Sequence, residues 1–406
     1  MGQILSQPVT EKDTESGSDD RLLFGVSSMQ GWRVSMEDAH AAVLDLAPSG
    51  PEKVSFFAVY DGHGGRRAAI FSGENLHNIV ALQDAFKAKN YPVALKDGFL
   101  STDRSLLADR EFEQDPSGCT ATTALVTDTK IFVANSGDSR TVLGVKGIAK
   151  PLSFDHKPQN EGEKARICAA GGFVEDGRVN GNLALSRAIG DFEFKRSPTL
   201  PPEEQVVTVC PDIMEHDITP DDEFLVLACD GIWDCLDSQA VVEFVRRGIV
   251  EGQELSFICE NIMDHCLAPE SDMSGIGCDN MTMMIVALLN GKTKEEWYQT
   301  IKDRVANGEG PVGAPELAAP KESLQSPREE SRHEDTQKQD GSALAIMRLL
   351  EESGVMDENG RVVIKPELAS TLFKLTGGAA AAESGAIEAV DANDDNDDDD
   401  KSNEKK

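Results

Sequence analysis

The chain has 406 residues, of which 39% are hydrophobic, and this length and composition suit one large globular domain or two smaller ones. The formal net charge of -33 argues against nucleic acid or an anionic membrane as a main partner, because their phosphate groups would repel such a chain. No apolar run approaches the length of a membrane span, and the eight scattered cysteines, which form no CxxC pair, indicate the reduced and buried thiols of an intracellular protein.

Residues 1–21 are mostly polar and are predicted to form a flexible N-terminus. They open with MGQILS, which fits the myristoylation pattern of a glycine at position 2 with a hydroxyl residue at position 6. Gly2 is therefore a candidate for lipidation. Because a single acyl chain binds membranes weakly and the following residues are acidic, at most weak membrane association is expected.

Short apolar runs and amphipathic stretches alternate over residues 22–293, which we expect to form a single domain. Strands are predicted over residues 41–46, 54–60, 122–126, 130–135, 141–145, 223–229 and 281–288. Helices are predicted over residues 66–80, 84–103, 162–170, 238–247 and 255–266. Short turns join most of the strands, as at Asp128-Thr129, so the pattern predicts an α+β domain in which helices cover an antiparallel sheet or sandwich.

The composition changes beyond this domain. The predicted segments are a closing helix over residues 294–306, a linker rich in Gly, Pro, Glu and Ser over 307–341, a small helical appendage over 342–375 and a disordered acidic tail over 376–406. The tail is not an EF-hand calcium loop, because it lacks the glycine and glutamate that such a loop needs. We interpret the segment after Asn307 as an interaction or targeting element, whose acidic tail either recruits basic partners or keeps the protein soluble.

Carboxylates gather at the ends of the predicted strands. Glu37 and Asp38 precede the strand at 41–46, whereas Asp61 directly follows the strand at 54–60. If these strands pair as an antiparallel hairpin, the start of one lies beside the end of the other. The three carboxylates would then share one edge of the sheet.

The same pattern recurs later in the domain. Acidic or amide side chains stand near further strand ends, at Asp138, Asp230, Asp234, Asp279 and Asn280. Each Asp taken alone fits an ordinary turn. Gathered together, however, carboxylates repel one another and raise one another's pKa unless a cation neutralises them.

Such a set of oxygen ligands suits Mg²⁺ or Mn²⁺ rather than zinc. Two ions about 3.5 to 4 Å apart form a common device for transferring a phosphoryl group to water. Gly62 fits this interpretation, because the carbonyl of a residue without a side chain can approach a metal closely. The residues alone therefore predict a metal-dependent phosphoryl-transfer site.

Several segments also occur in the order that is typical of one enzyme family. They are RVSMEDAH (33–40), VYDGHGG (59–65), SGCTATTALV (117–126), ANSGDSR (134–140), LALSRAIGD (183–191), LACDGIWD (227–234) and GCDNMT (277–282). These segments resemble the motifs of the metal-dependent serine/threonine protein phosphatases of type 2C, most closely the fungal members, from about residue 22 to residue 289. The resemblance implies a central antiparallel β-sandwich flanked by helices on both sides, with the metal site at one end.

The resemblance also implies roles for the clustered residues. Asp61 would bridge two metal ions. Asp230 and Asp279 would complete one metal site. Glu37 and the carbonyl of Gly62 would serve the other site. Asp38 and Asn280 would contact the metal ligands or metal-bound water. Asp138 and Asp234 would bind a weaker third metal ion.

Two further residues would act on the substrate. Arg33 would hold the phosphate, although an ion pair with Glu37 is its alternative role. His63 would protonate the leaving serine or threonine oxygen, a general-acid step that adds about 10² to 10⁴ in rate. A flap over residues 164–195 would shape substrate entry.

Other phosphatase mechanisms lack their residues in this chain. A cysteine-dependent phosphatase needs Cys-x5-Arg and a different class of metallophosphoesterase needs an Asn-His pair, and neither pattern occurs. The Gly291-Lys292-Thr293 segment is not a phosphate-binding P-loop, because Val286 stands where its first glycine should be. A catalytically silent scaffold that binds phosphoproteins remains the alternative, but it should have lost a central carboxylate, and none is missing.

We therefore predict an enzyme that hydrolyses phosphoserine and phosphothreonine on proteins with two Mg²⁺ or Mn²⁺ ions, and with a weaker third ion in addition. Its expected partners are phosphorylated substrate proteins and proteins that bind the C-terminal extension, with no nucleic acid. We expect a monomer in the cytoplasm and nucleus.

Overall fold

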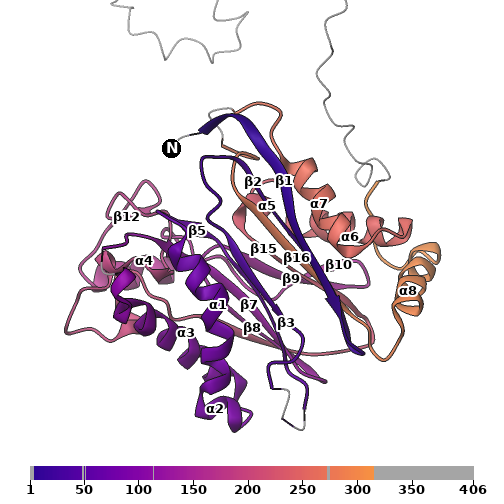
Figure 1. Cartoon of the computed structure of the whole chain (residues 1–406), viewed down its shortest axis with the longest axis horizontal. Coiled ribbons are helices and arrows are strands. Elements are labelled where there is room, and N and C mark those ends of the chain that lie inside the picture. Colours follow the sequence, from indigo (N-terminus) through magenta and orange to yellow (C-terminus); the bar gives the residue numbers. More distant parts are fainter. Residues whose placement is uncertain (1–3, 48–49, 51, 113, 272–274, 315–406) are drawn as a thin grey trace, which may run out of the picture. The chain divides into compact units, whose positions relative to one another are not determined.

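The computed structural model describes residues 4–47, 50, 52–112, 114–271 and 275–314. Two antiparallel β-sheets lie face to face, and helices cover the outer face of each (Figure 1). The predicted α+β fold, a β-sandwich flanked by helices on both sides, is confirmed. Gly2, most of the predicted linker, the appendage and the acidic tail lie outside the described residues.

The first sheet joins the N-terminal strand to the last strand of the domain. Its order is β1 (Ile4–Ser18), β2 (Leu22–Arg33), β16 (Met281–Leu288), β15 (Asp222–Ala228), β9 (Arg140–Val145) and β10 (Ile148–Pro151). All neighbouring strands in it are antiparallel. β16 is buried along its whole length, so its methionines and leucine are core packing.

The second sheet is also antiparallel. Its order is β14 (Asp212–Asp217), β8 (Lys130–Ser136), β7 (Ala121–Val126), β4 (Ser55–Tyr60) and β3 (Ala39–Val43). The predicted turn at Asp128-Thr129 joins β7 to β8, and β3 pairs with β4 as the expected antiparallel hairpin.

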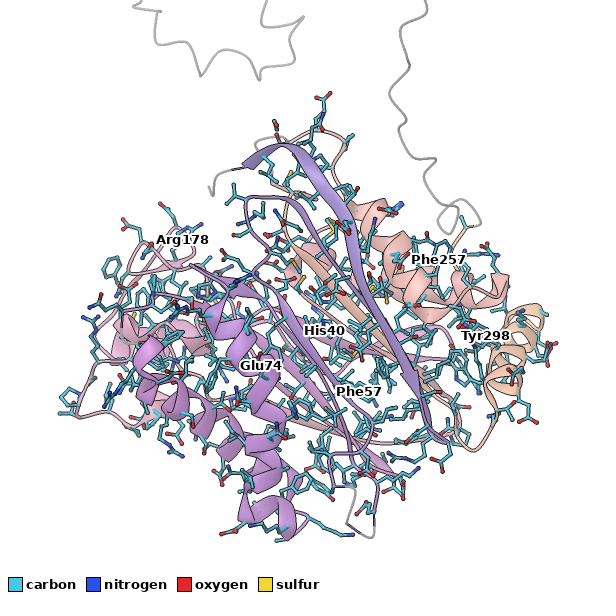
Figure 2. The ribbon with its side chains drawn as sticks, viewed as in Figure 1. His40, Phe57, Glu74, Arg178, Phe257 and Tyr298 are labelled. Atoms are coloured by element: carbon cyan, nitrogen blue, oxygen red, sulfur yellow. The ribbon has the colours of Figure 1, made fainter. Side chains whose placement is uncertain are left out.

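The strand β4 shows how the layers are built. Successive side chains of a strand point to opposite faces of its sheet. Phe57, which Figure 2 labels, is fully buried in the core between the sheets, where its ring centroid lies 5.7 Å from that of Phe24. Phe56 and Tyr60 face the other way and pack under the helices. Both faces of β4 are therefore apolar.

Helices cover the two outer faces. α1 (Arg67–Leu82), α2 (Asp84–Lys87) and α3 (Tyr91–Ala108) lie over the second sheet (Figure 1). The first sheet is covered by α5 (Asp230–Trp233), α6 (Ser238–Glu251), α7 (Leu255–Cys266) and α8 (Lys294–Ala306). α8 has the predicted bounds of the closing helix. No described helix is both long and apolar enough to cross a membrane.

Most of the remaining elements lie between β10 and β14 in the chain. The flap contains α4 (Glu161–Ala169), the hairpin of β11 (Val174–Glu175) and β12 (Arg178–Val179), and β13 (Ile189–Gly190). β13 joins a small sheet with β6 (Gly118–Cys119) and β5 (Gly62–His63). The 3-10 turns are η1 (Arg110–Phe112), η2 (Phe192–Phe194) and η3 (Pro202–Glu204). The small sheet ties the end of the flap to the segment that carries His63.

The prediction of a flexible N-terminus over residues 1–21 is wrong, because residues 4–18 form β1. β1 is an edge strand with mostly exposed side chains, so its polar composition conceals it. Lys12 pairs with Asp264, and the Thr14 hydroxyl donates to Glu260 at 2.8 Å, so two contacts with α7 add to the ladder with β2.

Three other expectations need correction. The helix predicted over 84–103 is two helices, because Pro92 fits only the first turn of a helix and α3 therefore starts anew at Tyr91. The strands β2, β10 and β14 were not predicted. Among the cysteines, which were expected to be buried, Cys168 is exposed and Cys210 and Cys235 are only partly buried.

A buried ion pair anchors α6 to the first sheet. The guanidinium of Arg246 lies 3.2 Å from the carboxylate of Glu223, and both side chains are 0% exposed. Arg304 of α8 adds a second contact to Glu223 at 3.0 Å. Arg246 also donates to the carbonyl of Pro311 at 3.0 Å, so the chain after α8 folds back onto α6.

Candidate active site

Two pairs of antiparallel strands bring the acidic residues to one edge of the sandwich. Ala39 lies opposite Tyr60, so the residues before β3 meet the residue after β4. Ala228 lies opposite Met283, so the end of β15 meets the start of β16. These strand ends carry the side chains of Glu37, Asp38, Asp61, Asp230 and Asp279.

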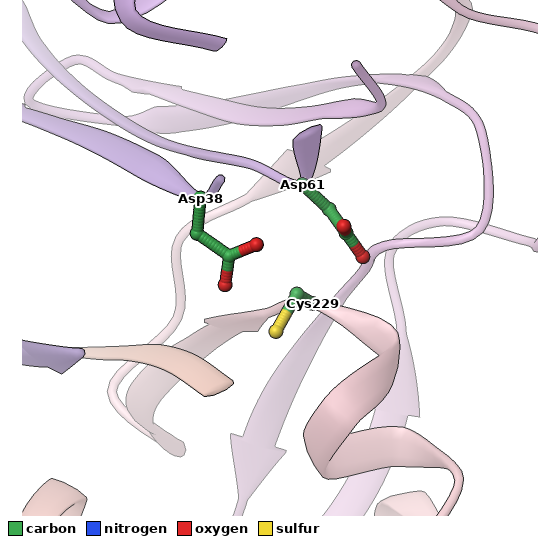
Figure 3. A group of neighbouring side chains, drawn as sticks. All are labelled: Asp38, Asp61 and Cys229. Atoms are coloured by element: carbon green, nitrogen blue, oxygen red, sulfur yellow. The ribbon is translucent and has the colours of Figure 1, made fainter. Parts of the chain in front are cut away.

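Asp61 stands at the centre of the acidic cluster. Oxygen atoms of Asp61, Asp138 and Asp230 all lie within 4.8 Å of one another. A second group joins Asp61 to Asp38 and to the thiol of Cys229, again within 4.8 Å (Figure 3). Asp61 belongs to both groups, a position from which one carboxylate can face two ions.

The cluster is electrostatically strained without a cation. Burial raises the pKa of Asp61 well above its usual range, and the nearby Asp230 and Asp38 raise it further. The pKa of Asp230 is raised in the same way, by burial first and then by Asp138 and Asp279. Burial raises the pKa of Asp38 to about 7. Carboxylates this crowded ionise together only beside positive charge, so the residues fit a metal centre.

Two details support that fit. Oδ1 of Asp38 is buried and has no hydrogen-bond partner among the described residues, whereas its Oδ2 accepts a bond from the Thr282 hydroxyl at 2.7 Å. The Cys229 thiol is buried and donates to the carbonyl of Asn280 at 3.6 Å, and its soft sulfur suits hard divalent cations poorly. The ligand atoms that remain are oxygens, which hard divalent cations prefer.

Glu37 and Gly62 meet through the backbone. A side chain at position 62 would collide with the main-chain carbonyl of Glu37, so this close approach requires glycine. The Glu37 carboxylate accepts bonds from the Ser35 hydroxyl at 2.8 Å and the Gly65 N–H at 3.2 Å. Glu37 belongs to neither of the two groups of clustered ligand atoms.

Arg33 and Asp279 form an ion pair at the mouth of the site. Nη2 of Arg33 lies 2.5 Å from Oδ2 of Asp279, and the Arg33 side chain is 43% exposed. The alternative partner considered for Arg33, Glu37, is therefore wrong. Asp279 lies outside both clustered groups, although it raises the pKa of Asp61 and Asp230.

Asn280 fixes the loop that carries Glu37. Its Oδ1 accepts a hydrogen bond from the Glu37 N–H at 3.0 Å. Its Nδ2 donates to the carbonyls of Gln30 at 2.8 Å and Ser35 at 3.0 Å. The amide is thus bound to the backbone of β2 and of the loop between β2 and β3.

His63 is held by an acid from the end of the flap. Its Nε2 lies 2.7 Å from Oδ2 of Asp191, a side chain that is 5% exposed. Burial lowers the pKa of His63, but the charge and hydrogen bond of Asp191 outweigh it, so the net pKa is raised. The imidazolium is therefore favoured, as a general acid requires.

The two residues predicted for a third metal lie at the same edge. Oδ2 of Asp138 is 2.5 Å from the ammonium of Lys157, which belongs to the turn before α4. Burial raises the pKa of Asp234, and Asp138 and Asp279 raise it further. Asp234 is not one of the clustered ligands.

A cavity of about 600 Å³ opens over the cluster. Arg33 and His63 line it from the sandwich, and Arg178, Leu185 and Phe194 line it from the flap. Figure 2 shows Arg178 on the flap hairpin, far from the helices of the first sheet. The predicted flap therefore does border the site.

Comparison with known proteins decides the family. Residues 22–275 match the family described as Protein phosphatase 2C. The chain belongs to this family. It is 60% identical over 324 residues to Protein phosphatase 2C homolog 2 of Hypocrea jecorina, covering 78% of this chain and 74% of that one. It is also 60% identical over 321 residues to Protein phosphatase 2C homolog 2 of Schizosaccharomyces pombe, covering 78% and 87%.

Solved structures of phosphatases share the fold. A phosphatase of Toxoplasma gondii matches with a TM-score of 0.59 and 25% identity, over 70% of this chain and 97% of that one. The protein phosphatases 2C are metal-dependent serine/threonine protein phosphatases, so this chain is an enzyme of that class. The predicted family, including its fungal relatives, is confirmed.

Sequence reasoning missed three residues of this type 2C phosphatase site. Asp191 closes the quoted segment LALSRAIGD, but nothing in the sequence indicates that it meets His63. Cys229 directly precedes Asp230, and its place at a strand end was the available signal. Lys157 lies far in sequence from every predicted ligand except Asp138, so only the folded chain shows its contact.

Proposed function

We propose that the acidic edge holds two Mg²⁺ or Mn²⁺ ions and that the enzyme hydrolyses phosphoserine and phosphothreonine on proteins. The observation that carries the two-ion count is the position of Asp61, which belongs to both groups of clustered ligand atoms. When bound, such ions supply a water of lowered pKa and positive charge beside the phosphoryl oxygens.

The chain offers ligands on each side of Asp61. Asp230 lies within 4.8 Å of it, and Asp279 lies two residues before β16, which pairs with the strand that ends before Asp230. Gly62 follows Asp61 directly in the chain, and its backbone meets that of Glu37. We assign Asp61 as the shared ligand and these four as the further ligands.

The contacts of the residues around these ligands suggest further roles. Asp38 belongs to the Asp61 group and keeps one buried oxygen without a partner, so we assign it to the metal centre through water. Asn280 supports the centre indirectly by holding the loop of Glu37. Asp138 and Asp234 are proposed for a weaker third ion.

Arg33 and His63 act on the substrate. The guanidinium of Arg33 is planar and part-exposed at the cavity, so it can bind phosphate in a two-pronged fashion after leaving Asp279. Nε2 of His63 is engaged by Asp191, so Nδ1 is the ring nitrogen that donates a proton to the leaving oxygen. Asp191 keeps the imidazole charged and oriented.

The proposed setting follows from charge and composition. The net charge of -33 supports protein rather than nucleic-acid partners, and we propose a monomer in the cytoplasm and nucleus. The C-terminal extension is proposed as an interaction element, and Gly2 as a lipid site that gives weak membrane association.

The test is phosphate release from a phosphothreonine peptide, with and without Mn²⁺. Wild-type protein should need the metal, and Asp61→Asn and Asp230→Asn should lose the activity. Unfolding curves of the metal-free proteins serve as the control for folding. Equal turnover by wild type and both variants would overturn the assigned metal centre.

A further inference from the structure

Lys157 brings a positive charge into direct contact with the acidic cluster. Its ammonium lies 2.5 Å from Oδ2 of Asp138, whose side chain is 5% exposed. Asp138 in turn lies within 4.8 Å of Asp61 and Asp230. The ammonium also interacts favourably with the carboxylates of Asp230 and Asp234. Lys157 is therefore a cation that the chain itself supplies to these carboxylates, and the guanidinium of Arg140 also interacts with Asp138 and Asp234.

The backbone around Lys157 is fixed on both sides. The preceding residue, His156, donates its N–H to the carbonyl of Gly137 at 2.9 Å and accepts the Gly137 N–H on Nδ1 at 3.2 Å. Because Gly137 directly precedes Asp138, these two bonds set the ammonium against that carboxylate. The carbonyl of Lys157 accepts the Asn160 N–H at 3.0 Å, which closes the turn before α4.

The turn is also tied to the flap. The Ser186 hydroxyl donates to the carbonyl of His156 at 2.9 Å. Nε2 of His156 lies 3.1 Å from Oδ2 of Asp212, on the edge strand β14. Contacts of His156 with the flap, with β14 and with Gly137 thus fix the backbone that carries Lys157.

We propose that Lys157 is a tethered counter-ion that competes with a third metal ion for Asp138. This inference rests on the proposed function, because it presumes the two ions at Asp61. A divalent ion at Asp138 must displace the ammonium or share the carboxylate with it against charge repulsion. Lys157 therefore weakens the third site selectively and keeps the resting enzyme at two ions. It is a positioning residue that acts through Asp138 and does not touch the substrate.

The measurement is Mn²⁺ binding to the full-length protein, by calorimetry and by the electron paramagnetic resonance signal of free Mn²⁺. Lys157→Met removes the charge and keeps the length, and Lys157→Gln repeats this with a second neutral side chain. Lys157→Arg keeps the charge. Lys164→Met is the matched control, because Lys164 is an exposed lysine of α4.

Both neutral variants should bind the weakest Mn²⁺ at least about tenfold more tightly than wild type, because removing a positive charge that contacts the Asp138 carboxylate raises the cation affinity of that carboxylate by about this order. Lys157→Arg and Lys164→Met should match wild type. Adding Asp138→Asn to Lys157→Met should abolish the gain. The inference is overturned if the neutral variants bind as wild type does, or if the gain survives Asp138→Asn.

A different variant in the same titration tests the proposed two-ion site. Asp61→Asn should lose the tight Mn²⁺ ions in the same titration, whatever residue stands at position 157. Tight binding that survives Asp61→Asn would overturn the two-ion assignment. The change in the weakest binding constant, in contrast, reports on Lys157 alone.

Discussion

Nε2 of His63 lies 2.7 Å from Oδ2 of Asp191, although the two residues are 128 positions apart in the chain. The small sheet of β5, β6 and β13 creates this contact, because it sets the segment of His63 beside the end of the flap. Asp191 adopts a left-handed backbone conformation with φ of 50°, which an Asp tolerates better than most residues. The segment that carries His63 and the end of the flap are therefore one structural unit.

Asp191→Asn should lower kcat on a phosphothreonine peptide by about 10- to 100-fold, because the proton donor loses the carboxylate that charges and orients it. The loss should be much smaller on p-nitrophenyl phosphate, whose leaving group needs no proton. His63→Gln is the reference and should show the same split between the two substrates. An equal loss on both would mean that Asp191 acts only on folding or metal binding.

Metal affinity should fall as the pH drops below about 7. In the metal-free protein, burial raises the pKa of Asp38 to about 7 and raises that of Asp61 and Asp230 well above the usual range, so these groups hold protons there. Binding a cation must release those protons, and the affinity therefore rises with pH. Calorimetry of Mn²⁺ binding in buffers of different ionisation enthalpy counts the protons. A count of zero between pH 6 and pH 7 would contradict the prediction.

Glu163→Gln should destabilise the metal-free protein by about 2 to 3 kcal/mol at pH 7. Burial raises the pKa of Glu163, but hydrogen bonds and charge from Arg187 and Arg166 outweigh it and lower the pKa to about 2. A carboxyl group whose pKa is lower in the folded than in the unfolded protein stabilises the folded state at pH values above the unfolded pKa of about 4.5. This contribution to stability is lost as the pH falls towards the folded pKa of about 2. Urea unfolding at pH 7 and pH 3 should show the difference from wild type shrinking at the lower pH.

Glu223→Gln should cost about 3 to 5 kcal/mol of stability, because it leaves the fully buried Arg246 without its charge partner. Arg246→Met alone should also destabilise, since the buried carboxylate of Glu223 then loses one of its two arginine partners. Chemical unfolding of both single variants and of the double variant forms a thermodynamic cycle. A double variant that loses the sum of the two single losses would show that the pair is not coupled.

The fold and the acidic edge follow from local sequence signals. Apolar runs such as 54–60 and 281–288 end in carboxylates, and antiparallel pairing then gathers those carboxylates whatever the details of the loops. The strand β1 could not be predicted in this way, because an exposed edge strand is held by backbone hydrogen bonds and has no apolar pattern.

The contacts that complete the site could not be predicted in this way. Lys157 reaches Asp138 and Asp191 reaches His63 only because the flap packs back on the sandwich, a long-range event without periodicity in the sequence. The pairing of Arg33 with Asp279 depends on side-chain geometry in the same way, and the partner considered from the sequence, Glu37, was the wrong carboxylate.

The strand β1 has a consequence for attachment of the enzyme to a surface. Ile4, two residues after Gly2, already lies in the ladder with β2. If Gly2 carries a myristoyl group, only one residue separates the lipid from β1. The catalytic domain would then lie directly against the bilayer, and the direction of β1 would set its orientation. Removing residues 4–18 would do more than delete a lipid site, because it would uncover the edge of β2 and offer it to other chains.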